Sequence, residues 1–463
     1  MIQGIRKTVC LLGVEIALGL GHALAGDPEL IALQQHGATA SRINIVLLAE
    51  GYRAEEHDKF VQDATTVLQG ILGTEPMLTY QNYFNAFGIF VESTESGSDH
   101  PGSNVFKDTY FSSSFSSFQI QRLLTIPPND LNGNFADGRG KVNALLQQFV
   151  PEYDLTAIVV NDPEYGGSGG STLVVSTHPS SAEIGVHEMG HSYAHLGDEY
   201  GDAYPGYPDL EEPNTTQETQ RDSIKWKNWI EDSTPIPTPE LDPRYEDVIG
   251  LFEGAHYHDT GWYRPKDDCK MQHLGIPFCS VCSEALVLST YRTLSPVDSF
   301  SPADSEPLTL SRPRVFNLRL IPMDRDTRQI DWTLNKVPIV PEEATELTVA
   351  AWMLPSESNE LVATVTDSTT LVRTDLDGLL KRSITWNLIR GDVIGPALQV
   401  DGSGDTMELS WDAIASAFTL EATDSASSPD WRAVGGEPIR DGTRFHQAIP
   451  AANKARFFRL HLP

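Results

Sequence analysis

Basic residues, cysteines and long apolar runs are scarce in this chain, and each shortage excludes a class of protein. It has 33 Lys and Arg and 64 Asp and Glu, which gives a formal net charge of −31 over 463 residues. That balance argues against nucleic-acid binding, which needs a basic face to meet the phosphates. No apolar run reaches the ~20 residues of a membrane-spanning helix, so we expect no membrane span.

Only four cysteines are present, and three of them lie close together at Cys269, Cys279 and Cys282. The fourth, Cys10, falls in the N-terminal signal pattern described below, so three cysteines remain. Three is an odd count, which allows one intramolecular disulfide and leaves one thiol over. The spacing Cys279-x-x-Cys282 is half of a zinc knuckle or a redox pair, without a second pair to complete it. We therefore predict a disulfide from Cys269 to one of the other two, in an oxidising compartment.

The first 25 residues have the pattern of a secretory signal peptide. Arg6 and Lys7 form a basic start, residues 8–20 are mostly apolar, and Ala23-Leu24-Ala25 is an A-x-A cleavage site. The sequence predicts cleavage near Ala25 and a secreted or periplasmic bacterial protein. An ordinary buried N-terminal helix is the alternative.

The following 270 residues, 26–295, predict a mixed α/β domain. Ile43–Leu48, Phe87–Val91 and Leu155–Asn161 are short apolar runs typical of buried strands, and Ala54–Leu72 has helical spacing of its apolar residues. Strand, helix and strand in alternation indicate an α/β layer. A chain of this length is expected to hold two or three domains.

After a Ser, Pro and Asp-rich linker at Ser295–Pro307, the pattern becomes all-β. Short runs separated by turn signals predict a β-sandwich over 308–394 and a small C-terminal β module over 395–463. The expected strands are Val315–Ile321, Gln329–Leu334, Glu346–Met353, Glu360–Thr366, Ser383–Leu388, Met407–Trp411, Ala417–Ala422 and Ala455–Leu460.

The stretch Ser180–Tyr200 carries the chemistry, because it places His-Glu-x-x-His on a predicted helix. Ser180 and Glu183 form a capping box at its start, and Gly197 predicts its end. His187 and His191 lie one helical turn apart, so both imidazoles can reach one Zn²⁺. Glu188 follows the first ligand, where a carboxylate can take a proton from an activated water.

Two segments flank this helix. Before it, Ser171–Ser176 predicts a short edge strand, which would hold an extended substrate by main-chain hydrogen bonds. After it, Tyr200–Pro239 predicts a long, partly irregular flap beside the cleft. The segment Asp130–Asp137 has oxygen ligands at alternate positions, as a calcium loop does, but Phe135 stands where a calcium loop needs Gly. We therefore interpret it as a surface turn. Ca²⁺ is expected only as an additional ion among the many carboxylates.

Several motifs in a fixed order over Ile43–Leu288 resemble the bacterial immunoglobulin A peptidase family of zinc metallopeptidases. They are Asn44–Tyr52, Glu164–Gly170, His187–Tyr200, Tyr263–Pro265, Cys269–Met271 and Phe278–Cys282. The resemblance implies a metzincin-like catalytic domain in which Met271 is the Met-turn residue beneath the metal. Metzincins continue with x-x-Gly-x-x-His/Asp, where this chain has Ala194 and Gly197, so the third ligand must be sought elsewhere.

A straight helix cannot bring a later residue back to the metal, since each residue adds ~1.5 Å. A break at Gly197 can, which makes Asp198 the expected third ligand and Glu199 the runner-up. His195 lies a further turn along the helix, so we expect it behind the metal ligands or on the surface and not as a ligand itself. For oxyanion donors across the cleft we expect Tyr263 and His273, near the Met-turn segment.

The sequence thus predicts a secreted zinc endopeptidase acting on protein or peptide substrates, with Glu188 as general base. The alternative is a secreted binding protein with a degenerate peptidase domain, whose β modules contact cell-surface glycan or protein. A different zinc hydrolase, such as a cell-wall amidase, is a third hypothesis.

Overall fold

The computed structural model describes residues 26–127, 137–392, 394–403, 405–451 and 455–462. The predicted signal peptide and most of the Asp130–Asp137 turn lie outside the described residues. The chain divides into two compact units. One comprises the chain up to Gln34 with Asn44–Gly70 and Ala86–Glu188, and the other Gln35–Ile43, Ile71–Asn85 and Met189–Pro463.

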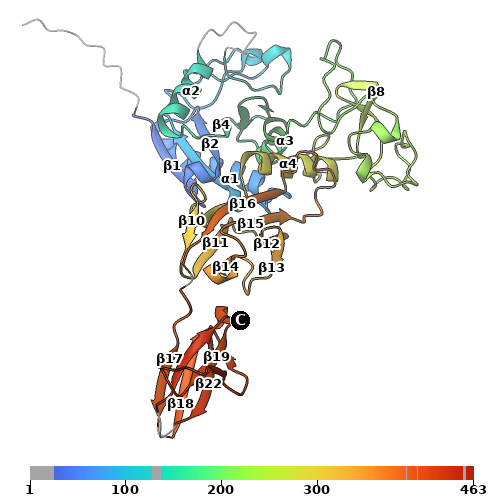
Figure 1. Ribbon diagram of the computed structural model, residues 1–463. Coiled ribbons are helices and arrows are strands. Elements are labelled where there is room, and N and C mark those ends of the chain that lie inside the picture. The colour runs from blue at the N-terminus through green and yellow to red at the C-terminus, as the bar shows by residue number, and fades with distance from the viewer. Residues whose placement is uncertain (1–25, 128–136, 393, 404, 452–454, 463) are drawn as a thin grey trace, which may run out of the picture. The chain divides into compact units, whose positions relative to one another are not determined.

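The first unit is built on a six-stranded sheet of order β1-β3-β2-β4-β6-β5. Figure 1 labels β1, β2 and β4 of this sheet. Strands β2, β4 and β6 run parallel, whereas β1 is antiparallel to β3 and β5 to β6. Every residue of β2 and β3 is buried, which explains their continuous apolar runs. The strands are β1 Glu29–Gln34, β2 Ile43–Glu50, β3 Phe84–Phe90, β4 Leu155–Val160, β5 Gly167–Ser168 and β6 Leu173–Ser176.

Three helices accompany this sheet: α1 His57–Gly73, α2 Gly138–Phe149 and α3 Ser181–Ala194, whose second half belongs to the other unit. The three strands and the helix predicted before residue 162 are confirmed. Helix α2 was not predicted; Asp137 caps it by accepting a hydrogen bond from the Gly140 backbone N–H at 2.8 Å.

The prediction of an exposed edge strand at Ser171–Ser176 is wrong. Strand β6 is parallel to β4 on one side and pairs with β5 on the other, through Gly167 to Val175 and Ser168 to Val174. Strand β5 is itself bridged by Leu123. The glycine-rich run Glu164–Gly170 supplies this covering strand, because glycines let the backbone approach β6 closely.

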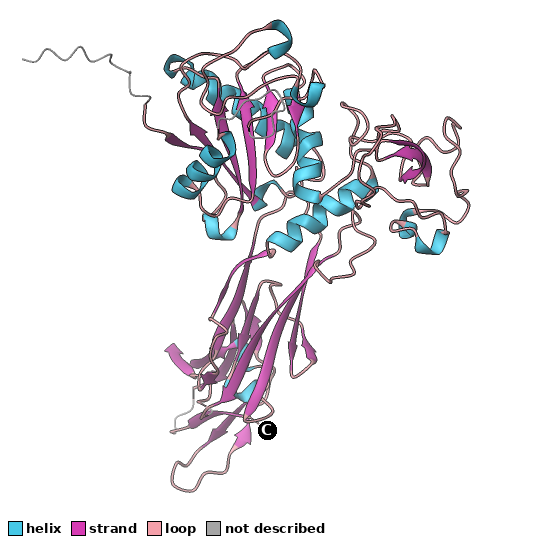
Figure 2. Ribbon diagram, turned by 90° about the horizontal axis from the view of Figure 1, so that it is seen from above, coloured by secondary structure: helices cyan, strands magenta, loops and turns pink. Residues whose placement is uncertain are grey.

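The second unit contains the hairpin β7 Phe252–Ala255 and β8 His258–Arg264, the helix α4 Ser280–Thr293 and two pairs of β-sheets. Much of 195–250 has neither helix nor long strand, as the predicted irregular flap requires. Figure 2 shows these loops in pink.

A five-stranded sheet, β10-β16-β15-β12-β13, and a three-stranded sheet, β14-β11-β9, share one core. Its centre is the stacked pair Trp332 and Trp386, with ring centroids 5.8 Å apart. The strands are β9 Val297–Ser301, β10 Leu308–Leu310, β11 Arg314–Leu320, β12 Arg328–Leu334, β13 Val337–Ile339, β14 Glu346–Val349, β15 Ser358–Asp367 and β16 Lys381–Arg390. All-β patterning is confirmed here, but Ser295–Pro307 is not only a linker, since β9 lies within it and pairs with β11.

The last sheets have the orders β17-β18-β22-β21 and β20-β19-β23 around a smaller core that includes Leu409, Trp411 and Leu420. Their strands are β17 Gln399–Ser403, β18 Thr406–Asp412, β19 Thr419–Thr423, β20 Arg432–Ala433, β21 Ile439–Asp441, β22 Arg444–Pro450 and β23 Phe457–His461. The chain is thus a mixed α/β domain followed by β modules. Among the described residues, no helix combines the length and apolar character needed to cross a bilayer.

Candidate active site and metal centre

Helix α3 and the four residues after it bring together three of the predicted metal ligands. One ligand atom each of His187, His191 and Asp198 lies within 4.8 Å of the other two. The helix buries Val186, Met189 and Tyr193 on its core side, and this anchors the turn that carries the two histidines. His187 is buried, whereas the His191 side chain keeps 21% of its surface exposed.

The chain reverses at His195, not at Gly197 as predicted. His195 adopts a left-handed backbone with φ of 54°, and the Leu196 N–H donates to the Gly190 carbonyl at 3.1 Å. The helix therefore ends at Ala194, and the exposed His195 that follows it adopts the left-handed conformation that glycine usually takes at a helix end. The earlier reversal carries Asp198 back beside the helix.

The geometry of His191 fits a metal ligand. Its Nδ1 lies 2.6 Å from the Leu196 carbonyl oxygen, which can only accept, so Nδ1 carries the proton and Nε2 is the nitrogen that can act as a ligand in a neutral ring. That Nε2 lies 3.3 Å from Asp198 Oδ1. Two ligands each about 2.1 Å from zinc in a tetrahedral site would be roughly 3.4 Å apart. The two atoms are spaced to share one ion.

Asp198 is held in place by Tyr257. The Tyr257 hydroxyl donates to Asp198 Oδ2 at 2.7 Å, so Oδ1 is the oxygen that faces His191. Burial and the neighbouring Asp198 charge raise the pKa of Tyr257 well above its ordinary value, so the phenol keeps its proton and continues to donate. The arrangement orients one carboxylate oxygen toward His191 Nε2.

Asn214 fixes the backbone of the same segment. Its Oδ1 accepts from the Gly197 N–H at 2.7 Å, and its Nδ2 donates to the Gly197 carbonyl at 2.9 Å and to Glu199 Oε1 at 2.8 Å. Neither Asn214 nor Tyr257 was predicted as part of the site. Asn214 comes from an irregular region and Tyr257 from the turn between β7 and β8, and in neither place does a periodic pattern mark a residue as important.

Met271 is fully buried against the helix turn between the two histidines. A Cβ added to Gly190 would lie 2.7 Å from the Met271 sulfur, which shows how closely the two residues pack. The Met271 carbonyl also accepts from the Glu199 N–H at 2.9 Å. The role of Met271 as a Met-turn residue stays a prediction.

The remaining predicted site residues have defined surroundings. Glu188 follows His187 on α3 and is partly exposed. Tyr263 is mostly buried in β8, and burial together with the Glu253 carboxylate raises the pKa of its phenol. His273 is exposed, with Nδ1 2.8 Å from Asp268 Oδ1. The catalytic parts of these three stay predictions.

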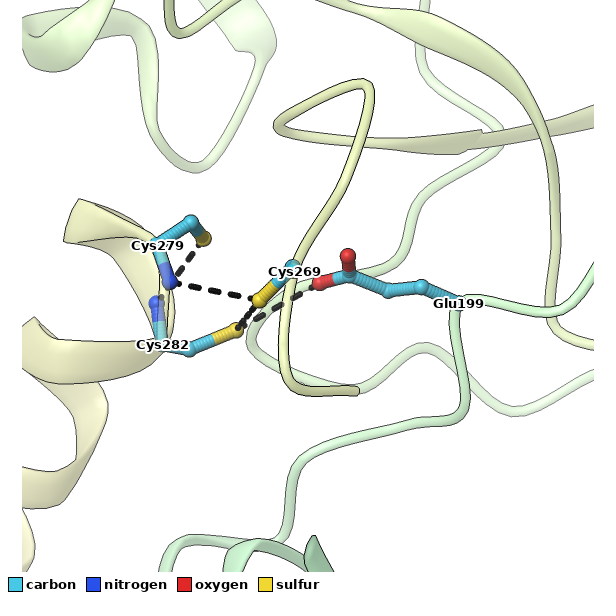
Figure 3. A group of neighbouring side chains, drawn as sticks. All are labelled: Glu199, Cys269, Cys279 and Cys282. Atoms are coloured by element: carbon cyan, nitrogen blue, oxygen red, sulfur yellow. Dashed lines mark hydrogen bonds between the residues drawn. The ribbon is translucent and has the colours of Figure 1, made fainter. Parts of the chain in front are cut away.

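Glu199, the runner-up ligand, belongs to a different cluster. It lies with Cys269, Cys279 and Cys282, as Figure 3 shows, and all four residues are buried. The predicted disulfide is absent, because all three cysteines are free thiols. The Cys269 and Cys282 sulfurs are 3.7 Å apart, far beyond the 2.03–2.05 Å of a disulfide bond.

Comparison with known proteins identifies the family. No curated protein matches the chain. The family model of IgA Peptidase M64 matches residues 31–248 and 241–289, more than half of the chain. The matched residues include α3, Asp198, Met271 and the three cysteines. The chain therefore belongs to the IgA peptidase M64 family, and its main domain is a peptidase domain.

Proposed function

We propose that this protein is a secreted zinc-dependent endopeptidase that hydrolyses peptide bonds of protein substrates. The observation that supports it most is the convergence of His187, His191 and Asp198 in a chain of a peptidase family. Two imidazoles and one carboxylate are a usual protein ligand set for catalytic zinc, and three ligands leave a fourth position open.

Zinc bound there would supply a Lewis acid that polarises the scissile carbonyl and makes a water molecule more acidic. Glu188 then accepts the proton of the attacking water and returns it to the leaving amine. A carboxylate is too weak a base to take a proton from ordinary water, so the base depends on the ligands that hold the metal. Tyr263 and His273 are our proposed donors to the developing oxyanion.

Substitution of Glu188 by Ala tests the mechanism. The variant should keep its zinc, because Glu188 is not a ligand, and should lose hydrolysis of peptide substrates. Zinc content and cleavage of a peptide library are measured on the same preparations. Substantial proteolysis by Glu188→Ala would refute the assignment of the base.

A matched pair of histidine substitutions tests the ligands. His191→Ala should lose the catalytic zinc. His195→Asn should retain it, because His195 is exposed and asparagine tolerates its left-handed backbone. For the third ligand, full zinc occupancy of the catalytic site in Asp198→Ala would eliminate Asp198.

Two further measurements test the rest of the proposal. A mature N-terminus near Gly26 in protein recovered from the culture medium would support secretion, and an intact Met1 there would contradict it. Cleavage of no peptide would favour the binding-protein alternative, against which the intact His187, Glu188 and His191 argue. Cleavage that a chelator does not stop would contradict the zinc dependence.

A further inference from the structure

A second cluster of metal-ligating side chains lies beside the candidate active site. Cys269 comes from the segment that precedes Met271, and Cys279 and Cys282 from the start of α4. Glu199 completes the group, and one atom of each residue lies within 4.8 Å of the others. Cys269, Cys282 and Glu199 have no exposed surface, and Cys279 keeps 5%.

Glu199 has a buried carboxylate that the described residues satisfy only in part. Oε1 accepts from Asn214 Nδ2 at 2.8 Å and from the Cys282 thiol at 3.4 Å, while Oε2 is buried without any hydrogen-bond partner. Glu199 also forms no ion pair within the described part of the chain. An ionised carboxylate in this position costs several kcal/mol unless a cation accompanies it, and without a cation the group is relieved only by taking up a proton.

The spacing of the ligand atoms matches a tetrahedral metal site. Sulfurs about 2.3 Å from zinc in a tetrahedron are roughly 3.8 Å apart, and a sulfur and a carboxylate oxygen are roughly 3.6 Å apart. The observed distances are 3.7 Å between the Cys269 and Cys282 sulfurs and 3.4 Å from Cys282 Sγ to Glu199 Oε1. The same distances are too long for a covalent bond.

Backbone donors are arranged around the sulfurs. The Cys279 N–H donates to Cys269 Sγ at 3.2 Å and the Cys282 N–H to Cys279 Sγ at 3.5 Å. Cys279 is also the N-cap of the fourteen-residue helix α4, whose positive end stabilises anions. Thiolates bound to a metal are commonly supported by such hydrogen bonds.

From these observations we infer that Glu199, Cys269, Cys279 and Cys282 form a second, structural Zn²⁺ site. Three soft sulfur ligands and four-fold coordination select zinc over calcium or magnesium. Binding converts the thiols to thiolates and releases their protons to solvent, and nothing is oxidised or reduced. All four positions are taken by protein atoms, so this zinc would have no open position for water.

The second zinc would tie together two segments of the candidate active site. Glu199 follows Asp198 directly, and Cys269 precedes Met271 by two residues, while the Glu199 N–H already donates to the Met271 carbonyl at 2.9 Å. One ion would therefore fix the position of Asp198, the proposed third catalytic ligand, relative to Met271. This consequence rests on the proposed function, whereas the metal site itself does not.

Metal analysis of the purified full chain tests the inference. We expect two zinc ions per chain in the wild type and one in His191→Ala. Glu199→Gln and Cys282→Ser should each lose the other ion. Glu284→Gln is the matched control: it is also a buried glutamate, two residues beyond Cys282 on α4, but it accepts from Trp229 and lies outside the cluster. It should keep two ions.

Two measurements on chains with intact cysteines avoid variants that fail to fold. Cobalt exchanged for zinc should give an intense thiolate-to-cobalt charge-transfer band, which His191→Ala retains because the thiolates are untouched. Alkylation after denaturation in chelator without reductant, followed by peptide mapping, should label Cys269, Cys279 and Cys282.

The outcomes separate the two proposals. A disulfide-linked peptide among the three cysteines, or a single zinc without a cobalt–thiolate band, would overturn the second site and leave the proposed peptidase untouched. Two zinc ions in a chain that cleaves no peptide would support the second site and count against the proposed function.

Discussion

Replacing Gly190 with alanine perturbs the contact between the histidine helix and the residue beneath it. The new Cβ would lie 2.7 Å from the Met271 sulfur and 3.3 Å from its Cε. Contacts this short force Met271 to shift, and no flexible surface position is open to it, because its side chain is fully buried. Movement of Met271 would also disturb the hydrogen bond that the Glu199 N–H donates to the Met271 carbonyl.

Two opposing effects set the magnitude. Alanine stabilises a helix interior by about 0.5–1 kcal/mol over glycine. Overpacking of a filled core costs about 1–3 kcal/mol. We therefore expect Gly190→Ala to lower the free energy of unfolding by up to about 2 kcal/mol, although helix propensity alone would raise it. Met271→Ala alone should cost about 2–5 kcal/mol, because it leaves a cavity.

A double-mutant cycle in urea measures the coupling. The free energies are taken from the unfolding transition that zinc shifts, since a bound ligand stabilises only the part of the chain that binds it. In Gly190→Ala/Met271→Ala the added methyl fills part of the cavity, so the pair should be more stable than the sum of the single changes by about 1 kcal/mol or more.

Additivity of the two changes within about 0.5 kcal/mol would refute the reasoning, because it would mean that residues 190 and 271 do not touch. A stabilising Gly190→Ala would do so too. Gly73→Ala, at the end of α1 with nothing within 4 Å of the added Cβ, is the control for the helix effect of the substitution.

Three further predictions concern neighbouring features. Tyr257→Phe removes the donor to Asp198 and should weaken zinc binding about 10–100-fold in competition with a chelator; unchanged affinity would contradict the role of the hydroxyl. Gly51→Ala should lower the free energy of unfolding by about 2 kcal/mol or more, because Gly51 has a φ of +70° and the added Cβ would collide with the Gly97 carbonyl. An unchanged free energy in urea unfolding would be inconsistent with that contact. Burial raises the pKa of Glu50 above 4.5, so its contribution to stability is fully present below about pH 4.5 and is lost as pH rises through the folded-state pKa. The free energy of unfolding of the wild type, relative to that of Glu50→Gln, should therefore fall over that pH range. A rise would contradict the shift.

The local sequence pattern was sufficient to predict the elements whose burial follows a regular pattern along the chain. Strands β2 and β4 are short apolar runs with covered faces, and α1 repeats apolar residues at the helical period, so each was predicted within a few residues. The covering of β6 was not predictable in the same way. Strand β5 has only two residues, one of them Gly167, and its assignment depends entirely on its partner.

The sequence by itself determined the turn of helix that carries His187, Glu188 and His191, because the helical period places residues four apart on one face. It also determined the all-β character of the chain after Leu308. Tertiary structure alone separated Asp198 from Glu199: the reversal at His195, the Tyr257 hydroxyl and the Asn214 amide aim one carboxylate at the histidines and the other at three thiols. Adjacent residues look alike to any local pattern, and only partners distant in the chain decide which way each one points.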